Sequence, residues 1–173
     1  MLGEKIDPMP VPDFKHDFKD YQKFDIGAMG EFDVAILIEQ YAGKKPSKRL
    51  YPVWRGGYYY AARVRDNAAA PLGLLYVSRW SSTDAAEQFA GIYAESLKQR
   101  YTSAKEIGGP TPDSATESEE SKVDLLKGRH AWTTEEGPVI IEEHGDLVFV
   151  SESLDAATTS TLEKEVFSTP QVK

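Results

Sequence analysis

The chain has 173 residues, of which 40% are hydrophobic and 28% charged, and its formal net charge at pH 7 is −8. This length and composition are typical of one globular domain with its own core. The acidic balance argues against a nucleic-acid surface, and the lack of cysteine excludes disulfides, thiolate metal sites and cysteine nucleophiles. The longest apolar run, residues 34–38, is too short to cross a bilayer, so we predict no membrane insertion.

The first segment contains prolines at alternate positions: Pro8, Pro10 and Pro12. Proline fixes its own φ and disfavours helix at the preceding residue, so this pattern favours an extended chain. We predict a connector over residues 1–24, with one short helical turn between residues 13 and 24, where aromatic residues recur at spacings of four and three. The remaining residues, 25–173, are predicted to form a single domain.

Residues 26–42 contain the apolar run and no turn signal after Gly30, which predicts a helix that is buried on most sides. Residues 43–55 are basic and are interrupted by Pro46 and Pro52. This second stretch is predicted to be an exposed loop, either a solvated connector or a contact for an anion or a partner.

Residues 53–97 carry the most consistent local signals, and they predict a hairpin followed by a helix. The two strands are expected at residues 58–65 and 72–79, joined by a turn at Asp66 and Asn67. Apolar residues lie on both faces of the second strand, so we expect the sheet to be covered on both sides. Four polar residues then offer helix caps before the apolar residues of a helix begin: Ser81, Ser82, Thr83 and Asp84.

The rest of the chain predicts a short strand at residues 102–107 and then a mobile acidic loop at residues 108–122, which has no hydrophobic period. A three-strand meander is expected at residues 128–134, 139–143 and 146–151.

A turn at His144 and Gly145 would place Ile141 opposite Val148 and Val139 opposite Val150. A last helix is expected over residues 154–167, capped by Ser153.

Together these elements predict an α+β fold. It comprises an antiparallel sheet of about five or six strands, built from the hairpin and the meander, with helices packed on one or both faces.

The sequence contains few residue patterns that are typical of a catalytic or metal-binding site. The three histidines, His16, His130 and His144, lie in separate elements, and the HExxH zinc motif is absent. One polar cluster has the residue types of a metal site: Glu142, Glu143, His144 and Asp146. Adjacent residues of a strand point to opposite faces, so we interpret this cluster as ordinary turn and surface polarity. We therefore predict no catalytic residue, no metal and no cofactor, and a protein that is not an enzyme.

The aromatic residues at the start of the hairpin are the best candidates for contact with a partner or ligand: Trp54, Arg55, Tyr58 and Tyr60. The alternative is that these aromatic residues only pack the core and the sheet, since alternation divides the three tyrosines between the two faces. Trp54 separates the two hypotheses. A closely packed environment around Trp54 favours a scaffold role, and an open apolar pocket with polar groups favours ligand binding.

Four motifs between residues 4 and 101 occur in an order that resembles a known family. They are the proline-rich connector, a Gly-Glu-Phe helix start, a Trp-Gly-rich strand start and a helix start of the type Trp-Ser-x-x-Asp-Ala. In this chain the motifs are residues 8–12, 30–32, 54–57 and 80–89. They resemble the C-terminal half of bacterial, mostly secreted proteins with an N-terminal zinc-peptidase-like domain. The chain departs from that pattern at Gly57, where the family usually has aspartate.

The resemblance implies a non-catalytic accessory domain that docks on a zinc-peptidase-like domain or subunit outside this chain, and it favours an extracytoplasmic location. A second hypothesis is a free-standing module of Mog1/PsbP-like architecture that binds a small ligand or a partner. The coding sequence upstream of Met1 would separate the two, because the first needs a partner that carries the zinc motif.

Overall fold

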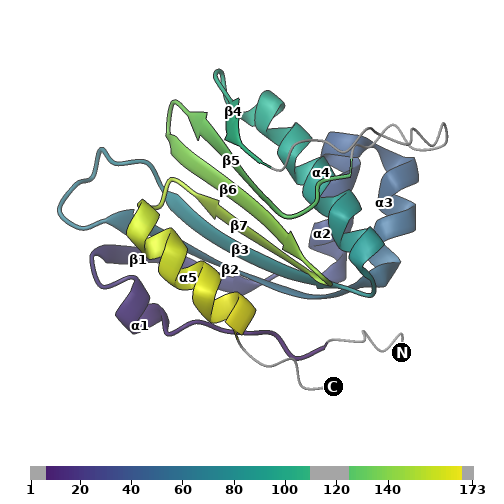
Figure 1. Ribbon diagram of the computed structural model, residues 1–173, viewed down its shortest axis with the longest axis horizontal. Helices are drawn as coiled ribbons and strands as arrows, with labels where there is room; N and C mark the ends of the chain where they lie inside the picture. The colour runs from purple at the N-terminus through teal and green to yellow at the C-terminus, as the bar shows by residue number, and fades with distance from the viewer. Residues whose placement is uncertain (1–6, 110–124, 169–173) are drawn as a thin grey trace.

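The computed structural model describes residues 7–109 and 125–168. Within them, seven strands form one antiparallel sheet with the order β1-β2-β3-β7-β6-β5-β4, and helices cover both of its faces (Figure 1). The strands are β1 (Tyr21–Ala28), β2 (Trp54–Val64), β3 (Gly73–Trp80), β4 (Lys105–Gly108), β5 (Arg129–Thr134), β6 (Gly137–His144) and β7 (Leu147–Glu152). The helices are α1 (Phe14–Asp17), α2 (Glu31–Ala42), α3 (Lys44–Leu50), α4 (Thr83–Arg100) and α5 (Ala156–Ser168), with a 3₁₀ turn at Tyr51–Val53.

The predicted hairpin and helix are confirmed as β2, β3 and α4. Ser82 caps α4, where its Oγ accepts a hydrogen bond from the Ala85 amide at 3.3 Å. Each β3 residue except Leu74 is buried, so the expectation of a strand covered on both faces is confirmed. This hairpin places its strands second and third in the sheet order, and the meander joins it through β7.

Two apolar cores lie on opposite faces of the sheet. Helices α2 and α4 pack over one face, on a core that includes Trp80, Phe89 and Ile141. Helices α1 and α5 lie over the other, on a core that includes Phe18 and Phe149. The sheet is thus the middle layer of three, as Figure 1 shows. The predicted α+β class is confirmed, and the sheet has seven strands where five or six were expected.

The additional strand is β1, at the edge of the sheet. The structure places residues 21–28 beside β2, whereas the sequence predicted a connector to residue 24 and a helix from residue 26. Most β1 residues are exposed, so the strand lacks the apolar alternation that would reveal it. Gly27 faces the Tyr59 ring so closely that a Cβ there would lie 2.8 Å from the ring. The predicted helix begins only at Glu31.

The predicted basic loop is also corrected, because residues 44–50 form helix α3. Gly43 reverses the chain with a φ of 90°, and Pro46 lies in the first turn, where an amide hydrogen has no helical partner. Ser47 then ties α3 to α2 by donating to the Ala35 carbonyl at 2.8 Å.

The meander is confirmed, but its predicted register is wrong by two residues. The turn consists of Gly145 and Asp146, so Ile141 pairs with Val150, and Val139 pairs with Glu152. A shift of two residues leaves every side chain on its expected face, which is why the apolar pattern could not distinguish the two registers.

The closing helix begins at Ala156, and its cap is Asp155, not Ser153. Asp155 Oδ1 accepts from the amides of Ala157 and Thr158, both at 2.9 Å. The predicted mobile loop lies outside the described residues from residue 110 onward.

Candidate functional site

An N-terminal segment of the chain lies across the ends of β2 and β3, and we call its residues 7–12 the strap. It has no helix or strand structure. The Asp7 amide donates to the carbonyl of Arg55 at 2.8 Å. Met9 lies over Gly56, where a Cβ would come within 3.2 Å of its sulfur. The glycine therefore leaves room for the strap to approach the strand backbone.

A buried arginine holds the next carbonyl of the strap. Arg79 of β3, which is 7% exposed, donates from Nη1 to the carbonyl oxygen of Pro8. Its Nε lies 3.3 Å from Asp146 Oδ2 in the β6–β7 turn. The carboxylate offsets the buried charge and orients the guanidinium toward the strap.

A tyrosine holds the following proline. The Tyr58 hydroxyl donates to the Pro10 carbonyl at 2.7 Å, and burial raises the pKa of this hydroxyl, so it stays a donor. Pro10 and Pro12 are buried, whereas Pro8 is exposed. We call the four residues of β2 and β3 that contact the strap in this way the strap site: Arg55, Gly56, Tyr58 and Arg79.

The four residues predicted as partner or ligand contacts do not form one site. A bulge between Trp54 and Gly56 turns Trp54 toward the α4 face, where it belongs to the core and is 5% exposed. Tyr58 and Tyr60 pack on the opposite face. Trp54 therefore lies in the closely packed environment that the scaffold hypothesis expects. Arg55 and Tyr58 contact the chain's own strap.

Sequence analysis did not identify Arg79 or Gly56 as site residues. One signal was present, because Arg79 is a charged residue in a strand whose other residues are almost all buried and mostly apolar. Such a residue requires a buried partner. The position of that partner, the strap, could not be deduced because the two segments are far apart in the sequence.

The acidic cluster of the β6–β7 turn is divided by the sheet. Glu142 lies near Arg129 and Glu163 on the α5 face, and burial followed by the Glu163 charge raises the pKa of its carboxyl. Glu143 accepts from the Gly128 amide at 3.2 Å, with the charge of Glu87 of α4 nearby. Among residues 7–109 and 125–168, no three side chains of metal-ligating type come together.

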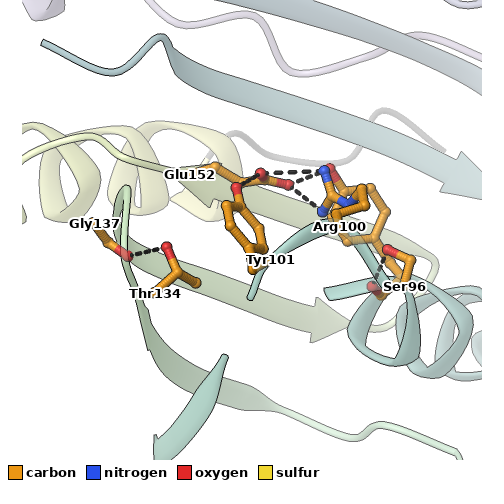
Figure 2. A network of polar contacts seen from close by, with 7 residues as sticks. Ser96, Arg100, Tyr101, Thr134, Gly137 and Glu152 are labelled. Atoms are coloured by element: carbon orange, nitrogen blue, oxygen red, sulfur yellow. Dashed lines mark hydrogen bonds and ion pairs between the residues drawn. The ribbon is translucent and has the colours of Figure 1, made fainter. Parts of the chain in front are cut away.

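A second polar network lies between the end of α4 and β7 (Figure 2). Glu152 is 4% exposed and accepts hydrogen bonds from Tyr93 at 2.6 Å, from Arg100 Nη2 at 2.7 Å and from Tyr101. The Arg100 guanidinium also lies 5.0 Å from the centroid of the Tyr93 ring. Because both oxygens of Glu152 are engaged, the network fastens α4 to the sheet and offers no free group to a ligand.

Within the described residues, no helix is long and apolar enough to cross a membrane. Comparison of the chain with protein-family models, with curated proteins and with solved structures finds no match.

Proposed function

We propose that the chain is a non-catalytic interaction domain that docks onto a zinc-peptidase-like domain or subunit outside it. The resemblance of residues 4–101 to the accessory half of such proteins suggests this partner. The observation that carries the proposal is a set of large apolar side chains exposed on two consecutive elements, β1 and α2. Apolar side chains exposed in this way are a common mark of a protein interface.

We call these exposed residues, which lie on both sides of the β1 edge, the β1–α2 surface: Phe24, Ile26, Phe32 and Ile36. Ile26 pairs with Tyr60 and so lies on the α1/α5 side of the sheet, whereas α2 packs on the other side. Phe24 is 68% exposed and Phe32 is 76% exposed. Phe32 and Ile36 are four residues apart in α2, so they lie on the same side of that helix. Strand β1 also lies at the edge of the sheet, where an incoming strand could pair with it. The surface therefore combines apolar anchors with an open sheet edge.

The polar groups support a role without catalysis. His16, His130 and His144 lie on α1, β5 and β6. His144 packs its ring against Phe167 at 5.3 Å, and His130 lies 2.6 Å from Glu106. Neither is paired with a serine or threonine nucleophile by any hydrogen bond between the described residues.

The test begins with the surrounding DNA sequence. The region upstream of the Met1 codon, or a neighbouring gene, should encode a zinc-peptidase-like domain with HExxH. That purified domain should bind this chain in calorimetry. The double variant Phe24→Ser, Phe32→Ser should bind at least ~tenfold more weakly, because anchors of an interface contribute most of its binding energy.

The matched control is Ile107→Ser. Ile107 is 62% exposed but lies on β4, at the opposite edge of the sheet. The Ile107→Ser variant should bind the zinc-peptidase-like domain as tightly as the unmodified chain does. Equal loss of binding in both variants, or no binding by the unmodified chain, would refute the proposal.

A further inference from the structure

The strap has the properties of a bound peptide. Each residue that precedes a proline in it is held extended, since the proline ring excludes the helical region there. Proline has no amide hydrogen, and an extended segment makes no internal hydrogen bonds, so its carbonyls are free to accept from another surface. The carbonyls of Pro8 and Pro10 accept from side chains of the strap site.

The strap site also has the properties of a preformed receptor. Arg79 is oriented by Asp146, which belongs to the β6–β7 turn and not to the strap. Tyr58 is held on β2, which pairs with a strand on each side. The sheet therefore fixes the backbone of both donors, and Asp146 lies beside the Arg79 guanidinium, without help from the strap. Such preorganisation favours peptide recognition.

The aromatic character of the surroundings agrees with this interpretation. The ring of Phe14 lies 6.1 Å from the ring of Tyr58, edge to face, and stacks on that of Tyr60 at 4.7 Å. Grooves that bind proline-rich segments are lined by aromatic rings and use a few polar side chains to bind backbone carbonyls. Gly56 adds a notch that admits the Met9 side chain.

We propose that the strap site is a peptide-binding site for an extended segment with proline at alternate positions. Residues 7–12 occupy it within the same chain, and a partner protein's segment of the same pattern displaces them. Because the strap is not a strand of the sheet, it can leave while every strand pairing of the sheet stays in place. The strap site and the β1–α2 surface share no residue, so this inference does not depend on the proposed docking.

The test uses a synthetic peptide, Asp-Pro-Met-Pro-Val-Pro-Asp, with blocked ends and a fluorescent label. The full chain with Met9→Asp has its own strap weakened, because a carboxylate cannot pack where the thioether does. This variant should bind the peptide, as measured by fluorescence anisotropy. The unmodified chain should bind it at least ~tenfold more weakly, because its strap competes at a high effective concentration.

Two controls test recognition itself. A peptide with aspartate in place of methionine should not bind the Met9→Asp chain. Adding Tyr58→Phe to that chain should weaken binding of the original peptide about fivefold, as expected for one lost hydrogen bond. A folded Met9→Asp chain that binds both peptides equally, or neither, would overturn the proposal.

A measurement on the unmodified chain decides the case where Met9→Asp does not fold. The Asp7 amide donates to the Arg55 carbonyl, so its hydrogen exchange reports whether the strap is in place. Millimolar unlabelled peptide should accelerate this exchange while the amides paired between β2 and β3 are unaffected. If the peptide leaves Asp7 exchange unchanged, the strap is part of the core and the proposal is wrong.

Discussion

Four aromatic residues pack between α4 and β3, and Phe89 of α4 lies at their centre. Phe89 is fully buried, and its ring centroid lies 4.7 Å from that of Trp80 and 6.0 Å from those of Tyr76 and Tyr93. Such close rings combine hydrophobic burial with favourable ring geometry. This residue thus couples α4 to the central hairpin.

Replacing Phe89 with alanine is therefore expected to lower the free energy of unfolding by about 3 to 5 kcal/mol, because it leaves a cavity that the surrounding rings cannot fill. Urea denaturation followed by circular dichroism measures the change. Glu95→Ala, on the exposed side of the same helix, is the matched control and should change stability by no more than about 0.5 kcal/mol. A loss below about 1 kcal/mol for Phe89→Ala would show that the core is not closed here.

One exposed carboxylate at the end of β5 has an ordered set of donors. Glu135 accepts from the amides of Thr102 and Ser103 at 2.7 and 3.0 Å, and from both of their hydroxyls. These hydrogen bonds, led by that from the Thr102 hydroxyl, lower the pKa of Glu135 from 4.5 to about 2. The carboxylate thus fixes the chain where it leaves α4.

The sign of the pH effect follows from this shift. A carboxyl group whose pKa is lower in the folded than in the unfolded protein stabilises the folded state at pH values above its pKa in the unfolded chain. This contribution is lost as the pH falls through the pKa of the folded state. Glu135→Gln should therefore be less stable than the unmodified chain at pH 7, and the difference should shrink between pH 4.5 and about 2. Urea denaturation at several pH values measures it.

Glu142→Gln serves as the comparison with the opposite sign. Burial and then the charge of Glu163 raise the pKa of Glu142, so its ionised form opposes folding above that pKa. This variant should gain stability relative to the unmodified chain at pH 7, and the gain should fade as the pH falls toward 4.5. Parallel pH profiles for the two variants would contradict both assignments.

At the scale of elements, the two-residue turn between β6 and β7 depends on glycine. Gly145 has a φ of 65°, which a residue with a Cβ adopts only at a cost, although no atom lies within 4 Å of the added Cβ. The turn sets the pairing of both strands and also carries Asp146, the partner of Arg79. The backbone conformation of one residue therefore affects the register and the strap site together.

Gly145→Ala should accordingly lower the free energy of unfolding by about 1 kcal/mol, through backbone strain alone. Gly108→Ala is the matched control, because its Cβ would also meet no atom and its φ is not in the left-handed region. That control should change stability by less than about 0.5 kcal/mol. Thermal or urea denaturation of the two variants side by side measures the difference, and equal losses would exclude strain at the turn as the cause.

At the scale of the whole molecule, the sheet separates two cores, and each is closed by its own helices. The side chains of metal-ligating type in the β6–β7 region are divided between the same two faces: Glu143 lies on the side of α4, and Glu142 on the side of α5. The layers that stabilise the fold thus also keep neighbouring carboxylates apart.

The purified chain is therefore expected to contain far less than one zinc per molecule after dialysis, and a chelator should not lower its melting temperature. Elemental analysis and thermal denaturation with and without EDTA test this. About one zinc per chain, together with a lower melting temperature in EDTA, would require a site that the described residues do not show.

The sequence by itself determined the elements with strong local patterns. Caps at residues 81–84 and the apolar period that follows were sufficient for α4, and apolar residues on both faces of β3 indicated a sheet covered on both sides. The proline spacing likewise predicted that the strap is extended. In these segments the local conformational preference and the pattern of burial agree, so no distant contact is needed to predict them.

Only the tertiary structure decided which residues meet. The bulge after Trp54 moved that side chain to the face opposite Tyr58, and β1 became a strand because β2 offers it an open edge. Arg79 meets Pro8, which is 71 residues away in the sequence. The energy of such contacts comes from pairing and packing between distant segments, so it leaves no periodic signal in either segment alone.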